Sequence, residues 1–573
     1  MNNGMKLNYI IFLVLSFLII FLYTTLFTPK TAKKAPQEKT SEGRVSEQTI
    51  SKEEQERPVN RADLSLTPQG KLITVNTPLY TGLFDTTGGR IFEWRLEKYR
   101  RGTEKNSPPV NLLEGSPPAF NTNLELEGIE VPNPIPFQFN GPSEIKVDGK
   151  QERLTFYWQS PDGFEVRKII TIDPSSYLLR QRLEVTNSKQ VPVKETLLIE
   201  SFDKAPKNSS SSFFVPDSSS QNNESFIAMV SNEVERIQKP KEATTLSGTI
   251  NWFGFADKYF MHTFLPQTGE ETQVRLEQFD GLIRSTFYYP TDTVPPGKTS
   301  VYESKLYLGP MDYGFLESVG YGLENATNYG WVGFIAKPLL WFLKALNEVF
   351  NNYGISIIVI TVIIRLVFLP LTLKGMGSMK EMQVRMQELK PKMDALKEKY
   401  KDDKAKQNQE LMKLYTSHGI NPLTGLGGCL PLLIQFPIFI ALYYVLQAAI
   451  ELRHSSFLWI NDLSSPEHLF DIPGTGIPFR ILPLAMGVSW YVSQKMTPTS
   501  TLGTDSAQMK IMEFMPIIFT IMFWGLPSGL ILYWTVSNIL SIAQQLYVNR
   551  RFTVPKGGIK NADSDRKGRK NSV

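Results

Sequence analysis

The 573-residue sequence contains one cysteine and only four histidines. The single cysteine, Cys429, rules out an internal disulfide bond, and the scattered histidines form no H-E-x-x-H motif, so we expect no metal site. The segment nearest to a phosphate-binding loop, DTVPPGKTS at 292–300, has Asp292 where that loop requires glycine, and its prolines remove backbone N–H donors. A G-x-S-x-G nucleophile motif is also missing. These absences predict a protein that is not an enzyme and has no cofactor.

Charged side chains are nearly missing from five apolar segments, which lie at 8–27, 355–373, 425–450, 481–494 and 514–548. The last is uncharged for 35 residues. As one helix it would extend about 52 Å, far beyond a hydrocarbon core of about 30 Å. We therefore expect it to fold back at 525–529, which gives six membrane spans. The first segment is longer than a signal-peptide core and no A-x-A site follows it, so 1–28 is predicted to be an uncleaved anchor.

The distribution of charge predicts the orientation of these spans. The stretch 374–421 carries 11 Lys and Arg against 7 Asp and Glu, and the tail after Val548 carries 8 against 2. The connection at 451–479 is acidic in balance. Because positively charged connections stay in the cytoplasm, we place the first two regions and both termini inside, and residues 29–353 outside.

The long outer part has the pattern of a β domain. After a polar, flexible linker at 29–60, short segments with alternating apolar residues, such as RLTFYWQ and FEVRKIITI, are separated by turn sequences such as SPDG and PPGK. Over 61–320 this pattern predicts a large antiparallel β-sandwich. In 321–353 the spacing of the charges favours an amphipathic helix in the membrane–water interface, with its Trp and Leu face in lipid. A seventh span is the alternative.

The inner connection at 374–422 carries another apolar pattern. Its residues step alternately by three and four positions: Met379, Met382, Met386, Leu389, Met393, Leu396 and Tyr400. A shorter apolar face follows KDDKAKQ. We expect an antiparallel helical hairpin with a kink at Pro391. Its methionines either form an adaptable apolar binding surface or only hold the two arms together.

One charge, Arg365, interrupts the second apolar segment in the run TVIIRLVFLPLT. A guanidinium at the centre of a span costs roughly 2.5–3.5 kcal/mol on insertion scales. Thr361 lies one turn before it. The other spans supply only uncharged polar side chains, namely Gln435, Gln494, Ser537, Asn538, Gln544 and Gln545. Arg365 is therefore either a cation–π or hydrogen-bonded staple between helices, or the charge of a wet cavity within the bilayer.

Short spans and frequent prolines favour the cavity. The fourth apolar segment has only 14 uncharged residues, and helices this short thin the bilayer locally. Prolines recur in the spans and free backbone groups, which a polar cavity tolerates better than lipid does. A polar trough in a thinned membrane would lower the cost of moving a hydrophilic segment part-way across. Its positive charge would attract acidic residues of that segment.

With these features the sequence resembles the YidC family of membrane-protein insertases over nearly the whole chain. The most specific stretches are YGWVGFIAKPLLWFLK, ISIIVITVIIRLVFLPLT, NPLTGLGGCLPLLIQFPIFIALYYVL and FMPIIFTIMFWGLPSGLILYWTVSNILSIAQQ. The resemblance implies an insertase and chaperone for nascent membrane proteins, acting alone or with the Sec translocon. It also implies the inner membrane of double-membraned bacteria, with residues 29–353 in the periplasm and a five-helix core around a hydrophilic groove.

The same resemblance assigns candidate site residues. The groove arginine of the family falls on Arg365, and the polar position one turn earlier on Thr361. Further groove positions fall on Gln435, Tyr533 and Trp534, and the surface along which clients slide on Phe436, Pro437, Ile438 and Phe439. Some members have a second tyrosine where this chain has Trp534, so we assign no hydrogen-bonding role there.

The hairpin and the basic tail at 549–573 resemble elements that recruit clients, ribosomes and the signal-recognition machinery. The charge of the tail could equally serve orientation or binding to anionic membrane lipids.

We therefore predict a polytopic α-helical membrane protein plus a large all-β sandwich domain outside the cytoplasm. Its membrane part divides into span two at 354–373, the hairpin at 374–422 and spans three to six at 423–548. Two other functions stay open. One is a transporter or channel, which the lack of intramembrane carboxylates disfavours, and the other is a membrane-tethered periplasmic chaperone or lipid-handling module. An intramembrane protease would need a catalytic pair, and no small-molecule substrate is expected.

Overall fold

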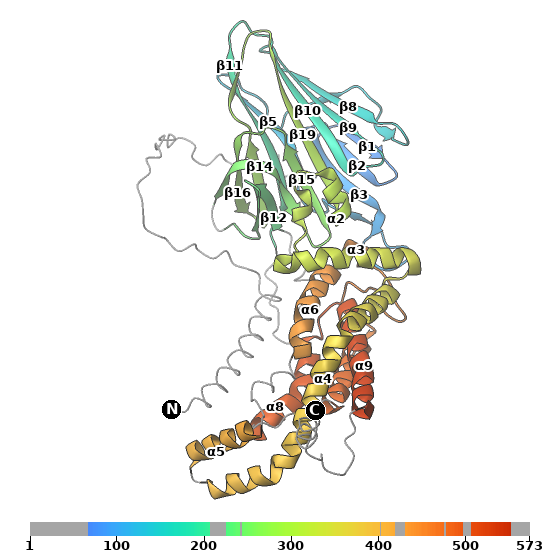
Figure 1. Ribbon diagram of the computed structural model, residues 1–573. Helices are drawn as coiled ribbons and strands as arrows, with labels where there is room; N and C mark the ends of the chain where they lie inside the picture. Colours follow the sequence, from blue (N-terminus) through green and yellow to red (C-terminus); the bar gives the residue numbers. More distant parts are fainter. Residues whose placement is uncertain are drawn as a thin grey trace, which may run out of the picture.

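The computed structural model describes residues 67–206, 225–240, 243–401, 403–418, 430–474, 477–496 and 506–551. The predicted anchor, the linker and nearly all of the basic tail lie outside these residues, as does Cys429. The strands gather at one end of the molecule and the long helices at the other, with helix α3 (Gly333–Phe350) lying across the boundary between them (Figure 1).

Two sheets form the β-rich part. The smaller has the strand order β4-β3-β2-β1-β7, and the larger has the order β18-β11-β17-β16-β14-β15-β19-β10-β9-β8-β6, with β5 beside β11 and β12 between β13 and β14. Among the described strands the pairs are antiparallel, except that β1 runs parallel to β7. The bounds are β1 Leu72–Asn76, β2 Tyr80–Asp85, β3 Arg90–Arg100, β4 Pro109–Asn111, β5 Asn121–Leu126, β6 Gln138–Phe139, β7 Glu144–Lys146, β8 Glu152–Gln159, β9 Phe164–Ile172, β10 Leu178–Asn187, β11 Val193–Lys204, β12 Ser225–Val230, β13 Glu233–Ile237, β14 Thr244–Ala256, β15 Phe260–Pro266, β16 Glu271–Phe279, β17 Leu282–Tyr288, β18 Asp292–Val294 and β19 Thr299–Pro310.

Alternation of apolar residues along the strands builds one continuous core. In β9 every second residue from Phe164 to Ile172 is buried, as period-2 patterning requires. Trp94 of β3 joins the small sheet to the large one, because its indole Nε1 donates to the carbonyl oxygen of Leu308 in β19 at 2.9 Å. Its ring also stacks on Tyr80, with centroids 3.9 Å apart. The predicted large β domain is confirmed.

Helix α3 follows the short elements α2 (Tyr313–Val319), η3 (Leu323–Ala326) and η4 (Gly330–Val332). Two of its four leucines, Leu340 and Leu343, are buried against the other helices. Its aromatic residues Phe334 and Trp341 are 72% and 71% exposed. Of the predicted lipid-facing surface of Trp and Leu, Leu340 and Leu343 are thus turned toward the apolar helices behind α3, while Trp341 stays exposed. The exposed aromatic residues, together with Val349, which is 75% exposed, leave part of α3 available to a membrane.

The predicted hairpin continues directly from the second span. One helix, α4, runs through Tyr353–Lys399, across the boundary that we expected near residue 374, and α5 (Lys404–Ser417) returns beside its last turns. The contact is apolar: Met386, Leu389 and Met393 of α4 are buried with Leu411 and Tyr415 of α5. The two described seam methionines thus hold the arms together. Pro391 lies inside α4, and a kink there stays a prediction.

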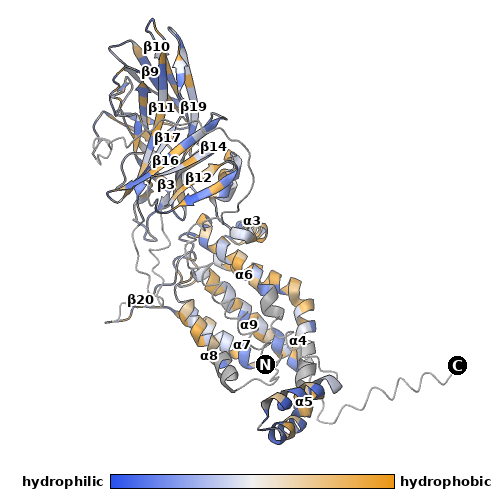
Figure 2. Cartoon of the chain, turned by 90° about the vertical axis from the view of Figure 1, so that its left-hand side faces the viewer, coloured by the Kyte–Doolittle hydropathy of each residue, from blue (hydrophilic) through white to orange (hydrophobic). Residues whose placement is uncertain are grey.

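The remaining helices are α6 (Leu430–Ala448), α7 (Ile481–Met496), α8 (Ser506–Met522) and α9 (Ser528–Arg551), with η6 (Ile450–Leu452) and the strand pair β20 (Phe470–Asp471) and β21 (Pro478–Phe479) in the connection before α7. The last apolar run forms two helices, α8 and α9, as predicted. Figure 2 shows hydrophobic residues along α6 and α8 and mainly hydrophilic ones on α5.

Within the part of the chain that the structure describes, one helical segment, Tyr353–Gly377, is long and apolar enough to cross a membrane alone. Shorter apolar helical segments lie at Gln435–Ala448 and Glu513–Met522. The total of six spans and the five-helix core stay predictions.

Candidate functional site around a partly buried arginine

Arg365 lies inside α4, where its guanidinium reaches two other helices. Its Nε donates to the hydroxyl oxygen of Ser537 in α9 at 3.0 Å, and its Nη2 donates to the Ser537 carbonyl oxygen at 3.0 Å. Nη2 also donates to Oε1 of Gln435 in α6 at 3.2 Å. The arginine thus connects three helices whose apolar surfaces otherwise pack against one another.

Gln435 extends this polar network. Its Nε2 donates to the Ser537 hydroxyl at 2.8 Å and to the hydroxyl of Tyr533 at 3.3 Å. Tyr533 and Ser537 are both buried and lie one turn apart on α9, so they share a helical face. We name Arg365, Gln435, Tyr533 and Ser537 the arginine network.

The charge of Arg365 has no anionic partner in the described residues, where no carboxylate forms an ion pair with it. Its Nη1 also has no hydrogen-bond partner there, and the side chain is only partly buried. An uncompensated charge in an apolar region is costly unless water or an anion can reach it. The site therefore has unused capacity to bind a carboxylate.

Thr361 lies apart from this network. Its hydroxyl donates to the carbonyl oxygen of Ile357 in its own helix at 2.5 Å, and the side chain is fully buried. The contact satisfies a hydroxyl within the helix and reaches no neighbouring helix. Thr361 is therefore not among the contacts of Arg365, and its place in the groove stays a prediction.

The four predicted slide residues, Phe436, Pro437, Ile438 and Phe439, divide between surface and core. The first three are partly buried, whereas Phe439 is inside the helical core. The Phe439 ring lies 4.6 Å from that of Trp534, which also contacts Phe523 at 5.1 Å and Trp490 at 5.6 Å. Tyr533 thus faces the polar network, while the adjacent Trp534 packs in an aromatic cluster.

Sequence reasoning missed which polar group holds Arg365. Ser537 was one of several uncharged candidates, and Trp490 was not singled out at all. A usable signal was available for Ser537, because it lies four residues after Tyr533 and such pairs meet on one face of a helix. To predict which span supplies the partner of Arg365, however, one must know how each helix is rotated about its axis, and the sequence does not give that rotation.

A second polar cluster fastens α3 at the edge of the helical part. Lys344 forms ion pairs with Asp312, at 3.3 Å, and with Glu451, in η6. Burial raises the pKa of Glu451, against the opposing effect of Lys344. Nearby, Arg453 Nη1 donates to the carbonyl oxygen of Arg100 in β3 at 2.7 Å. These contacts tie the β domain to the connection that follows α6.

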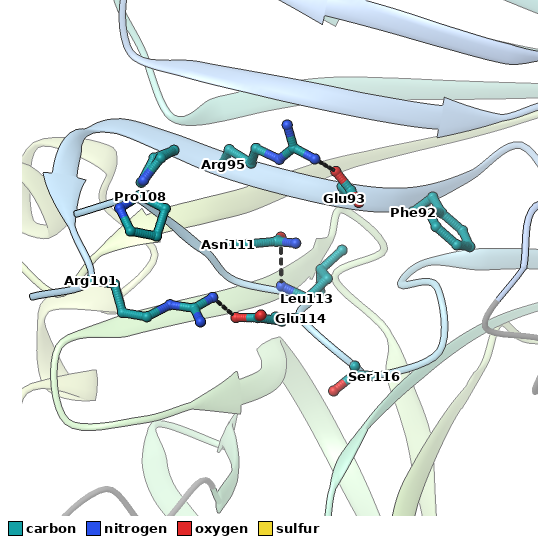
Figure 3. Close-up of a pocket in the computed structure, with 11 residues that line it drawn as sticks. Phe92, Glu93, Arg95, Arg101, Pro108, Asn111, Leu113, Glu114 and Ser116 are labelled. Carbon is teal, nitrogen blue, oxygen red and sulfur yellow. Dashed lines mark hydrogen bonds and ion pairs between the residues drawn. The ribbon is translucent and has the colours of Figure 1, made fainter. Parts of the chain in front are cut away.

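The β domain also has a surface cavity of about 430 Å³ beside β3 and β4 (Figure 3). Its charges are already paired, Arg95 with Glu93 and Arg101 with Glu114. Asn111 Oδ1 accepts from the backbone N–H of Leu113 at 3.3 Å. The cavity therefore presents little uncompensated charge to a ligand. Within the described residues no group of three His, Cys, Asp or Glu side chains could hold a metal ion.

The chain combines a large β domain, a helical part with one described segment long and apolar enough to cross a membrane, and a cationic site among apolar helices. The family model described as YidC periplasmic domain matches residues 72–342, and the one described as 60Kd inner membrane protein matches 345–556. The membrane protein insertase YidC of Pelobacter propionicus is 36% identical over 94% of this chain and 98% of its own length. That of Syntrophus aciditrophicus is 38% identical over 84% of this chain and 85% of its own.

The chain belongs to the YidC family of membrane protein insertases. Its substrates are accordingly nascent membrane proteins, its helical part is a membrane region, and its β domain is the periplasmic domain of the family.

Proposed function

We propose that this chain inserts hydrophobic segments through a groove whose polar end is the arginine network, without catalytic chemistry or a cofactor. The observation that carries the proposal is a partly buried guanidinium with no carboxylate partner in the described residues. In an apolar region such a group attracts an acidic residue near the translocating end of a client.

The hydrogen bonds of Arg365 make this attraction reversible. A carboxylate about 4 Å from the guanidinium gains roughly 4 kcal/mol at an effective dielectric constant near 20. Carrying an acidic side chain to the middle of a bilayer costs about 2.5–3.5 kcal/mol on insertion scales. The two terms are similar, so the arginine can lower the barrier for a client without trapping it. Ser537 and Gln435 satisfy the guanidinium again when the client leaves.

The shape of the helical part supports partial translocation. Helix α7 has 16 residues and therefore extends only about 24 Å, less than a hydrocarbon core of about 30 Å. The partly buried Phe436, Ile438 and Trp534, which pack against the same helical core, offer an apolar path beside the polar network. We infer that the client leaves sideways into lipid along this path, with Pro437 and Phe439 supporting it and Thr361 within the wall of α4.

The wider organisation is part of the proposal. Six spans would place both termini in the cytoplasm and residues 29–353 in the periplasm, with the α4–α5 hairpin and the basic tail inside. We infer that the hairpin and tail meet ribosomes and the signal-recognition machinery. Some clients would pass through this chain alone and others together with the Sec translocon.

The test uses the full-length protein in liposomes and a short single-span client with an acidic tail. Insertion is measured by protease protection for the wild type, Arg365→Lys and Arg365→Ala. We expect Arg365→Ala to lower insertion by about tenfold or more, because the anion loses its partner, while Arg365→Lys retains much of it. A client with a neutral tail is the control and should depend little on residue 365.

Equal insertion by the three folded variants would show that Arg365 is only a structural staple. Solute flux that depends on Arg365 would instead favour a transporter or channel.

A further inference from the structure

A cavity of about 630 Å³ lies where the β domain meets the start of α3. Three parts of the chain line it: β13 with Arg236, the segment from η3 onward with Glu324, and the start of α3 with Lys337. No member of the arginine network belongs to its wall. Its role is therefore separate from the proposed path of the client.

The charge in this cavity is not fully compensated. Arg236 Nη2 donates to the carbonyl oxygen of Ala326, which is a neutral group. Lys337 Nζ lies 4.8 Å from the centre of the Tyr313 ring. Neither cation forms an ion pair within the described ranges of the chain, and Glu324 supplies a single carboxylate against them. The cavity thus has an excess of positive charge.

The rim of the cavity is aromatic and exposed. Trp331 and Phe334 line it and are 59% and 72% exposed, although both are large apolar side chains. Helix α3 lies just before the apolar segment Tyr353–Gly377 and presents Trp341 in the same way. Aromatic side chains of this kind are enriched at the level of lipid headgroups. The cavity therefore combines cations with aromatic groups at the expected membrane surface.

We propose that this cavity binds the headgroup of an anionic phospholipid from the outer leaflet. Arg236 and Lys337 hold the phosphate through charge-assisted hydrogen bonds, and Trp331 and Phe334 contact the glycerol and upper acyl chains. The aromatic rim selects a lipid over free phosphate, because only the lipid has an apolar part to cover it. The bound lipid would fix the depth of α3 in the membrane.

The test measures lipid retention by the full-length protein in detergent with native mass spectrometry. Phosphatidylglycerol and phosphatidylcholine with identical acyl chains are compared. We expect Arg236→Gln and Lys337→Gln each to weaken phosphatidylglycerol binding roughly tenfold, as for the loss of a charge-assisted contact, and Lys337→Arg to retain it. Glu324→Gln should strengthen binding, a gain that misfolding cannot produce.

Lys305→Gln is the matched control, because Lys305 also lies over a tyrosine ring, 4.4 Å from that of Tyr321, but does not line the cavity. The proposal is overturned if the wild type retains the two lipids equally. It is also overturned if Lys305→Gln and Lys337→Gln lose phosphatidylglycerol binding equally, or if Glu324→Gln does not increase that binding. Inorganic phosphate at equal concentration is the competitor. If it displaces phosphatidylglycerol, and if Trp331→Ala does not change phosphatidylglycerol binding, the cavity is a simple anion site and the lipid assignment is overturned.

Discussion

Ser537 contributes both its hydroxyl and its carbonyl oxygen to Arg365, so one residue of α9 provides most of the contacts of the guanidinium. Gln435 supplies the remaining one and also bonds to Ser537. In our proposal these contacts hold the arginine between clients and give way to a carboxylate. A contact of this kind should stabilise the resting protein without being required for insertion.

Ser537→Ala should therefore separate stability from activity. Loss of the hydroxyl removes the acceptor that Arg365 Nε, Arg365 Nη2 and Gln435 Nε2 share, and should lower the free energy of unfolding by roughly 1–3 kcal/mol. Insertion of the acidic client should be kept or rise, because the guanidinium is less occupied. The control is Ser541→Ala, one turn further along α9, whose hydroxyl donates to the Ser537 carbonyl at 3.0 Å. Loss of insertion in a folded Ser537→Ala protein would mean that serine holds the arginine in its working position.

Lys168 is a second buried cation, in the core of the β domain. It occupies an inward position of β9, and its Nζ donates to the Thr122 hydroxyl at 2.8 Å and to the carbonyl oxygen of Phe120 at 3.3 Å. Burial lowers the pKa of Lys168 to about 7. In the unfolded chain a lysine has a pKa of about 10.4. Between these values the unfolded chain binds more protons than the folded one.

The stability of the β domain should consequently rise with pH from about 7 to about 10, by up to about 1.4 kcal/mol per unit. Lys168→Met should remove this rise, whereas Lys98→Met, at an exposed position of β3, should leave it unchanged. Urea unfolding of the full-length protein, followed by circular dichroism at pH 7, 8 and 9, measures the effect. A rise that persists in Lys168→Met would assign the titration to another group.

Arg365, Lys168 and Ser537 show how far single residues could be predicted from the sequence. Arg365 was found because a lone charge stands out in an apolar run. Lys168 was not singled out, although the alternation along β9 places it in the inward register of Val166 and Ile170, because a lysine is ordinarily expected on the exposed face of a strand. Ser537 was recognised as polar, but its partner depends on how α4, α6 and α9 are rotated.

Helix α3 is the element on which the parts of the molecule converge. Leu340 and Leu343 face the helical core, Phe334 and Trp341 are exposed, and Lys344 forms ion pairs with Asp312 and Glu451. Its helical character and its charges could be predicted, since they follow from spacing along one segment. Which apolar side turns toward protein could not, because that depends on α6, far away in sequence. The continuity of α4 was missed for the opposite reason: a change of composition near residue 374 suggested a boundary that the backbone does not have.

Lys344→Met should loosen α3. It leaves Glu451, whose side chain is 15% exposed, without its cation, and we expect a loss of roughly 1–3 kcal/mol after allowing for partial exposure. Adding Glu451→Gln should restore part of this loss, because the uncompensated charge is then gone. Thermal unfolding of the four proteins of this cycle measures the coupling. If the stability losses of Lys344→Met and Glu451→Gln simply add in the double variant, the ion pair contributes nothing to stability.

At the scale of the whole molecule, the β domain and the helices have separate apolar cores. Apart from Ile450, the β-domain core consists of residues from 73 to 326, whereas the core of the helices begins at Tyr329. Polar contacts join the two parts, such as those of Arg453 with the backbone of Arg100 and of Lys258 Nζ with the carbonyl oxygen of Ser464 at 3.3 Å. The arginine network lies wholly within the helical part.

Deletion of residues 61–320, which joins the linker at 29–60 directly to residue 321, should therefore leave the helices folded and able to insert a short acidic-tailed client. Lys344 keeps Glu451 in this variant, so the attachment of α3 is weakened but not lost.

The measurement is protease protection in liposomes, with Arg365→Ala in the same deletion background as the control. Insertion that survives the deletion but still depends on Arg365 would place the activity in the membrane part. Complete loss of insertion by a folded deletion variant would instead mean that the β domain acts on clients itself, as a membrane-tethered chaperone would. The separate cores favour the first outcome, because the polar contacts at the boundary can be replaced by water at little cost.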